Sequence, residues 1–172
     1  MTIPKILSLP TALLIGCAAL SAAPLAAQAI EAGQALPIAS VPGNGDATLP
    51  LVDGKARATY IDFWASWCTP CRQSFPWMQA LQTEYASRGL TVIAVNLDED
   101  RAAADTFLQR FHPGFQIHFD PQGRWAEQFG VQGMPTSVVI DRHGVPRFTH
   151  SGFVPDDRQT YTRHVEQLLA EQ

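Results

Sequence analysis

The sequence predicts an α/β fold in which helices flank a central β-sheet, and two observations lead to this class. Apolar runs of strand length alternate with amphipathic segments of helical period between residues 58 and 111, which is typical of parallel strands joined by helices. Of the 172 residues, 46% are hydrophobic and 16% are charged, so the chain is globular rather than disordered or fibrous. This length suits one domain with a single core.

Residues 1–29 have the pattern of a secretory signal peptide. A single basic residue precedes an apolar stretch rich in Ala and Leu, and small residues occupy the −3 and −1 positions of a cut before Ile30. Two alternatives stay open: Cys17 could be lipidated as in bacterial lipoproteins, or the segment could remain as an uncleaved anchor. Every route exports the domain to an oxidising compartment, the periplasm, with membrane anchoring only through this segment.

The first elements follow in order along the exported chain. Residues 30–57 are rich in Gly and Pro and predict a surface lead-in with one or two edge strands. Residues 58–65 are mostly β-branched and aromatic, which indicates a buried central strand. A helix is expected from Pro70 to Gly89, with a kink at Pro76. The domain proper is expected to span residues 58–172.

The remaining elements complete the sheet and its helical cover. Residues 90–97 predict a second strand and residues 101–111 a second helix, whose inward stripe is Ala104, Phe107, Leu108 and Phe111. A short strand near 115–119 and a helical turn at 124–129 follow. The last predicted elements are a hairpin of 137–140 with 147–151, and a helix capped by Asp156 or Asp157 with Tyr161, Val165, Leu168 and Leu169 inward.

A Cys-x-x-Cys motif lies where the first strand meets the first helix. Unpaired N–H groups and the helix dipole at this position favour a thiolate at Cys68. Cys71 lies one turn further on, near enough for a disulfide yet shielded, so we interpret Cys68 as the attacking nucleophile and Cys71 as the resolving thiol. A static structural disulfide and half of a zinc site are the alternatives, although no second Cys or His pair is present for zinc.

Met134, Pro135 and Thr136 precede a predicted strand and form the second candidate element. A cis bond before Pro135 would place the proline against the dithiol and offer the backbone of Met134 to an extended substrate. Trp67, beside the first cysteine, is expected to shield the dithiol and to contact substrate, with a place in the core as the alternative. These four residues make up the predicted substrate groove.

Residues 62–72, with Gly133 to Thr136 far downstream, resemble the thioredoxin superfamily. The extra helix and strand between Leu97 and Phe129, together with the signal peptide, resemble its TlpA/ResA/CcmG-like branch of exported thiol-disulfide oxidoreductases. The resemblance covers about residues 58–170 and implies a thioredoxin fold: a central mixed β-sheet flanked by helices, with the helix-strand insertion of that branch. It also implies reduction of disulfides in exported proteins, including apocytochrome c, and re-reduction by a membrane electron-donor protein.

Two departures from the branch concern its acidic group. The branch commonly has a Glu three residues after the second cysteine, where this chain has Ser74. Asp62 instead matches the buried acid of thioredoxin, and its lysine partner there would fall near Ala94. A desolvated carboxyl has a raised pKa that suits general acid–base chemistry near neutral pH. The alternative is a salt-bridged or strand-edge aspartate.

The expected function is therefore that of a monomeric disulfide reductase that needs no cofactor or metal and acts on disulfides in proteins. The Thr-Pro pair between the cysteines lacks the histidine of DsbA-type oxidases, although an oxidase stays open. A non-catalytic metallochaperone or assembly adaptor is the other alternative. The net charge of −4 and the lack of a Lys/Arg run argue against nucleic acid, and five scattered histidines show no ligand spacing.

Overall fold

The structure, a computed structural model, describes residues 40–42, 48–50 and 55–171. The predicted signal peptide, its cut before Ile30 and the alternative lipidation site Cys17 lie outside the described residues. Two short strands of the lead-in, β1 (Ser40–Pro42) and β2 (Thr48–Pro50), pair antiparallel with each other. They form a two-stranded sheet of their own and do not extend the edge of the central sheet.

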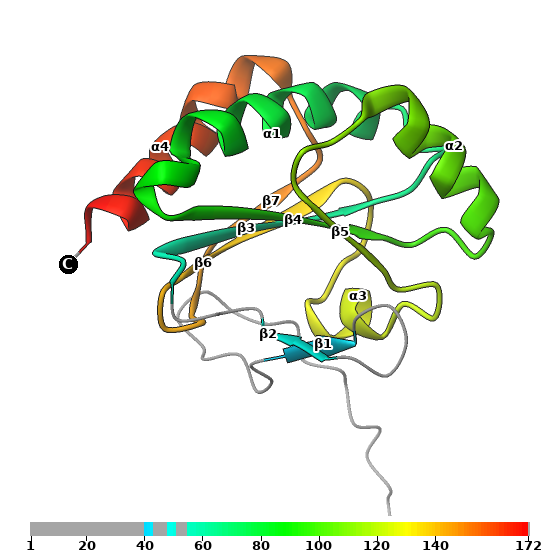
Figure 1. Ribbon diagram of the computed structural model, residues 1–172, viewed down its shortest axis with the longest axis horizontal. Helices are drawn as coiled ribbons and strands as arrows, with labels where there is room; N and C mark the ends of the chain where they lie inside the picture. Colours follow the sequence, from blue (N-terminus) through cyan, green and yellow to red (C-terminus); the bar gives the residue numbers. More distant parts are fainter. Residues whose placement is uncertain (1–39, 43–47, 51–54, 172) are drawn as a thin grey trace, which may run out of the picture.

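The central sheet has five strands in the order β5-β4-β3-β6-β7 (Figure 1). The parallel part consists of β3 (Ala58–Trp64), β4 (Leu90–Asn96) and β5 (Gln116–Phe119). The antiparallel part adds β6 (Thr136–Asp141), which pairs with β3, and β7 (Pro146–Ser151) beyond it. The sheet is therefore mixed, as the resemblance implied, and the predicted hairpin is confirmed.

Helices cover both faces of this sheet. They are α1 (Cys71–Tyr85), α2 (Arg101–Phe111), α3 (Arg124–Gln128) and α4 (Arg158–Ala170). Figure 1 shows α1, α2 and α4 on one face and α3 on the other. Because α2 and β5 are the elements inserted between β4 and α3, the expected helix-strand insertion is present. Among the described residues no helix is long and apolar enough to cross a membrane.

The central strand β3 is buried along its whole length because both faces of the sheet are covered. Alternate side chains point to opposite faces. Tyr60 and Trp64 join the core under α1 and α4, while Ile61 and Phe63 join a second core with Trp125 of α3. Alternation thus places Asp62 on the α1 and α4 face, between Tyr60 and Trp64.

Helix boundaries differ from the predictions in small ways with local causes. Pro70 is the N-cap residue of α1, which continues through Pro76 to Tyr85; a separate 3₁₀ turn then leads to Gly89, whose φ of 99° suits glycine. The prediction that an aspartate side chain caps α4 is wrong: Asp157 is at the N-cap but its side chain accepts no capping bond, because a 3₁₀ turn leads into the helix. The inward residues of α4 are buried as predicted.

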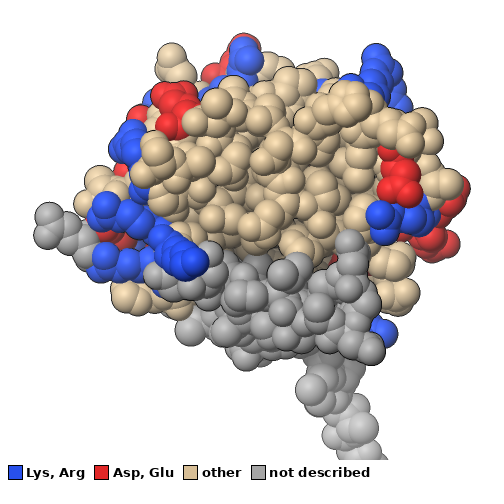
Figure 2. Space-filling model, viewed as in Figure 1, with Lys and Arg blue, Asp and Glu red and all other residues tan. Residues whose placement is uncertain are grey.

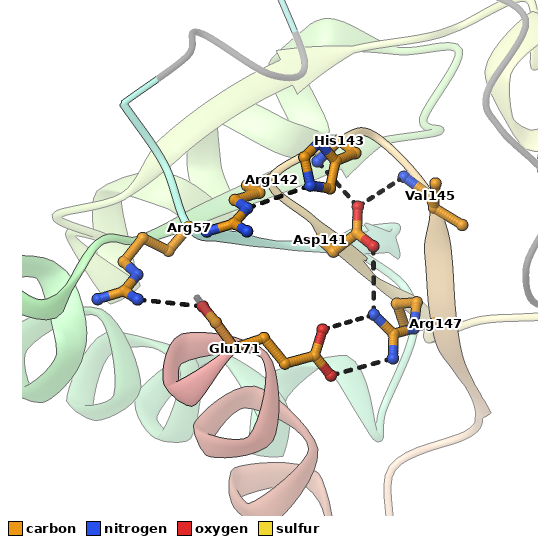
Figure 3. Close-up of polar contacts among 7 residues, drawn as sticks. All are labelled: Arg57, Asp141, Arg142, His143, Val145, Arg147 and Glu171. Atoms are coloured by element: carbon orange, nitrogen blue, oxygen red, sulfur yellow. Dashed lines mark hydrogen bonds and ion pairs between the residues drawn. The ribbon is translucent and has the colours of Figure 1, made fainter.

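The end of α4 is tied to the β6–β7 hairpin by charged groups (Figure 3). Arg147 of β7 donates to both carboxylate oxygens of Glu171, at 2.7 and 3.0 Å, and to Asp141 of β6 at 3.2 Å. Arg57, just before β3, donates to the backbone oxygen of Glu171 at 3.0 Å. These contacts hold the C-terminal helix against β6 and β7. They lie at the end of the sheet that is opposite the cysteines.

Candidate active site

The two cysteines form a disulfide at the start of α1. Their sulfurs are 2.01 Å apart and their Cα atoms 5.3 Å apart. Cys68 is 3% exposed and Cys71 is fully buried, so attack from solvent can reach only the first sulfur. The backbone N–H of Cys71 donates to Cys68 Sγ at 3.2 Å. A helix N-terminal donor directed at this sulfur would stabilise a thiolate there once the disulfide is reduced.

The loop that carries Cys68 is held by Asp98, which was not among the candidate site residues. Asp98 accepts from the backbone N–H of Ser66 at 2.8 Å and from its hydroxyl at 3.0 Å. Asn96 donates to the same carboxylate at 2.7 Å. Asp100 does cap α2, accepting from Ala102 N–H at 2.9 Å. The available signal was the place of Asp98 just after β4, because parallel strands end at the same sheet edge.

The segment before β6 has the backbone form expected for it. The Met134–Pro135 peptide bond is cis. Thr136 pairs with Phe63 of β3 in the sheet register, and its hydroxyl donates to Gly133 O at 2.7 Å. Met134 is half-buried and packs against the core cluster that contains both cysteines. The segment therefore leads into β6 beside the end of β3 from which the chain continues to the cysteines, and its place in a substrate groove stays a prediction.

Trp67 is the second part of the predicted groove. Its side chain is 67% exposed, which makes the alternative of a core tryptophan wrong. A large aromatic surface next to a reactive sulfur is the kind of residue that contacts a protein partner. The position of Trp67 thus suits contact with a substrate rather than a structural role.

Asp62 lies in the middle of the sheet and is 2% exposed. Burial raises the pKa of its carboxyl well above the usual value, and Oδ2 has no hydrogen-bond partner. Its neighbours in the register are Ala94 on β4 and Ser137 on β6, so no lysine stands where thioredoxin has one. The strand-edge alternative is wrong, and within the described residues Asp62 makes no ion pair. A carboxyl with a raised pKa accepts a proton more readily than an exposed aspartate does.

Ser74 is buried one turn after Cys71. Its hydroxyl donates to the backbone oxygen of Cys71 at 3.1 Å. The position at which related proteins commonly carry a glutamate is thus inside the site, but here it is occupied by a short side chain bonded to its own helix. Asp62 is a buried acid on the sheet face that α1 covers.

A buried polar chain on the same sheet face was not predicted. The hydroxyl of Tyr60 donates to Ser137 Oγ at 2.7 Å, and this oxygen is 3.3 Å from His150 Nδ1. His150 Nε2 is 2.8 Å from His164 Nδ1 on α4. Two of the histidines that look scattered in the sequence are therefore neighbours. Burial, and then the nearby His164, lower the pKa of His150 to about 4.

This histidine pair has no third ligand beside it. In the part of the chain that the structure describes, no group of three or more His, Cys, Asp or Glu side chains could hold a metal ion. The two imidazoles instead stack at 5.1 Å, and His164 stacks on Phe148 at 4.0 Å. The half-buried pair packs between β7 and α4.

Comparison with known proteins gives the family. Residues 31–168 match the Redoxin family. The thiol-disulfide oxidoreductase ResA of Bacillus thuringiensis subsp. konkukian is 32% identical over 96 residues, 56% of each chain. ResA of Geobacillus thermodenitrificans is 29% identical over 118 residues, 69% of this chain and 67% of its own. The chain thus spans little more than half of the first of these relatives.

A solved structure resembles the fold over most of the chain. The Chlorobium tepidum protein provisionally named thiol:disulfide interchange protein DsbE is 40% identical, with a TM-score of 0.76, and the match covers 83% of this chain and all of that one. The strand order, the cis bond before Pro135 and the Cys-x-x-Cys at the start of α1 agree with these matches. The chain belongs to the Redoxin family and is a TlpA/ResA/CcmG-like member of the thioredoxin superfamily.

Proposed function

We propose that this protein is a thiol-disulfide oxidoreductase that reduces disulfides in exported proteins. The observation that carries the proposal is the asymmetry of the cysteine pair: Cys68 is reachable and receives the N–H of Cys71, while Cys71 is fully buried. A pair arranged in this way can form a mixed disulfide at one sulfur and resolve it with the other. Membership of the Redoxin family and the likeness to ResA support this activity.

The proposed reaction transfers two electrons from the dithiol to the substrate. The Cys68 thiolate attacks one sulfur of the substrate disulfide; that bond breaks, and the leaving substrate thiolate takes a proton from solvent. The Cys71 thiol then gives its proton to ionised Asp62 and attacks Cys68 Sγ, which releases the second substrate thiolate. The protein ends in the disulfide form, with Cys68 bonded to Cys71 as in this structure.

The proposed substrate groove is built from Trp67 and the segment Met134 to Thr136. The exposed indole of Trp67 contacts the substrate beside its disulfide, and the backbone of Met134 pairs with an extended substrate segment. Because strand-like pairing uses backbone groups, this contact accepts many sequences. Preference among substrates must then come from side chains around the dithiol.

The direction of the reaction is tested by the reduction potential of the Cys68/Cys71 pair, measured by equilibration with defined thiol buffers. We expect a value below about −220 mV, toward the thioredoxin value of about −270 mV. A value near about −120 mV, as in DsbA, would contradict a reductase and indicate an oxidase. A reductase of this kind requires a membrane electron-donor protein in the periplasm to restore its dithiol, with cytochrome c maturation as one pathway that needs it.

Trapping of mixed disulfides identifies the substrate proteins and tests which cysteine attacks and which one resolves. Cys71→Ala should accumulate mixed disulfides on Cys68, because the resolving thiol is absent. Cys68→Ala is the matched control and should trap nothing, since Cys71 is buried. Equal trapping by both variants would contradict the assignment of Cys68 as nucleophile and Cys71 as resolving thiol. Cys68→Ser should abolish turnover; retained function in that variant would instead indicate a non-catalytic adaptor.

A further inference from the structure

A hollow of about 160 Å³ lies beside the dithiol, between the loop before it, α1 and α2. Its lining includes Ser66 and Arg72 on the cysteine side and Phe107, Arg110 and Phe111 on α2. Ser66 precedes Cys68 by two residues and Arg72 follows Cys71 directly. Any protein whose disulfide reaches Cys68 therefore passes close to this hollow.

Two arginines and no acidic residue are among the residues that line the hollow. Arg72 donates to the backbone oxygen of Ser66 at 3.4 Å, which holds it at the cysteine side. Arg110 lies on the other side, with its guanidinium carbon 5.9 Å from the centre of the Phe111 ring. The walls between the two cations are the rings of Phe107 and Phe111.

Neither Arg72 nor Arg110 forms an ion pair with a residue that the structure describes. Around the rim of the face shown in Figure 2, basic and acidic side chains mostly lie beside one another. The ion pairs among the described residues are Arg101–Asp105, Arg147–Asp141 and Arg147–Glu171. Asp98, which binds Ser66, is not part of the lining. A chain with a net charge of −4 thus carries a local positive site next to its reactive sulfur.

We propose that this hollow is a substrate subsite that binds the carboxylate side chain of an acidic residue close to the reactive disulfide of the protein substrate. The proposal rests on the proposed exchange at Cys68. Arginine binds carboxylates with charge-assisted, often bidentate hydrogen bonds, and the phenylalanine rings suit the methylene groups of a glutamate. Because Ser66 and Arg72 flank the two cysteines in the sequence, the acidic residue is placed a few positions from the substrate cysteine.

The test compares two disulfide-bonded peptides that differ only in Glu or Gln three residues from the reactive cysteine. The reduced full-length protein should reduce the Glu peptide about ten-fold faster at low salt, because one charge-assisted contact is worth that factor. High salt should shrink the difference. Arg110→Gln should lower the rate for the Glu peptide to about that for the Gln peptide, because the charge-assisted contact is lost.

Arg124→Gln on α3 is the matched control, because it removes the same charge from an exposed site on the other face of the sheet. The Arg124→Gln variant should still reduce the Glu peptide faster than the Gln peptide. Arg110→Glu is a second variant and should favour a Lys peptide. Equal rates for the Glu and Gln peptides in the unmodified protein, or a preference that survives in Arg110→Gln, would overturn the subsite. If neither peptide is reduced, the oxidoreductase proposal itself fails, and the subsite fails with it.

Discussion

At the scale of single residues, the surroundings of Asp62 determine the pKa of its carboxyl. A carboxyl placed between Tyr60 and Trp64 on a covered sheet face cannot be solvated, and its Oδ2 has no hydrogen-bond partner. The residue across from it on β4 is Ala94, so no counter-charge compensates for burial. A protein keeps such a costly group where its proton is useful.

Asp62→Asn should slow the resolution of mixed disulfides by about 100-fold, because a positioned base contributes that order of acceleration. The variant should also be more stable at pH 7. The pKa of Asp62 is raised in the folded protein, so as pH rises the carboxyl ionises first in the unfolded chain. This difference favours unfolding at pH 7. Asparagine does not ionise and therefore removes the effect. Stopped-flow release from a Cys68 mixed disulfide and urea unfolding, both across pH, measure these effects.

Asp120→Asn is the control for this variant. Burial raises the pKa of Asp120 too, but this carboxyl accepts from backbone N–H groups at the start of α3, the helix on the other face of the sheet from α1. Its replacement should change stability and leave the pH dependence of resolution intact. A resolution profile that is the same in Asp62→Asn and the unmodified protein would rule out Asp62 as the base.

At the scale of elements, the reactive loop is positioned from the neighbouring strand. Backbone groups connect Leu97 to Trp64 at 2.9 Å, and Asp98 then binds Ser66 through both its backbone and its hydroxyl. The end of β4 thus sets the path of the chain from β3 to α1. Within the loop, the N–H of Cys68 also donates to Ala65 O at 3.1 Å, and the Arg72 side chain donates to Ser66 O at 3.4 Å.

Asp98→Ala should lower the free energy of unfolding by about 2–3 kcal/mol, since it leaves the buried Asn96 amide and the Ser66 N–H without an acceptor. It should also slow reduction of peptide disulfides, because the loop carrying Cys68 loses its restraint. Asp100→Ala is the matched control: it removes one exposed cap bond of α2 and should cost about 1 kcal/mol. Equal rates of reduction in the two variants would show that Asp98 does not position the site.

At the scale of the whole molecule, acid should destabilise this fold through buried histidine. His150 connects β7 to α4 and is neutral in the folded protein because its pKa is lowered to about 4 by burial and by His164. In the unfolded chain it titrates near its usual value of about 6.5. Between these values the unfolded state binds the additional proton, so stability falls as pH falls.

The free energy of unfolding should therefore decrease by about 1–2 kcal/mol between pH 7 and pH 4 on account of His150. This is less than the full pKa shift implies, because the side chain is only half-buried and solvent screens its charge. Urea unfolding at several pH values measures it. His150→Gln should flatten the dependence, whereas His143→Gln, at an exposed turn, should not. Equal slopes in the two variants would contradict this origin.

The sequence by itself determined what depends on neighbours along the chain. Apolar runs define the strands, because a strand covered on both faces must be apolar throughout. The roles of Cys68 and Cys71 follow from a strand-to-helix junction, because helix N-terminal groups act only over the first turn. Asp62 could be singled out for the same kind of reason, since it interrupts an apolar strand.

Only the tertiary structure decided which distant residues meet. Ser66 finds Asp98 because β3 and β4 are parallel and end together. A polar chain joins Tyr60, Ser137 and His150 because of the register of β3, β6 and β7. This register brings Tyr60 to Ser137, 77 positions away, and Ser137 to His150, 13 positions away. Arg72 and Arg110 share a hollow because α2 packs beside the start of α1. Contacts of this kind depend on strand order and helix packing, which local pattern does not encode.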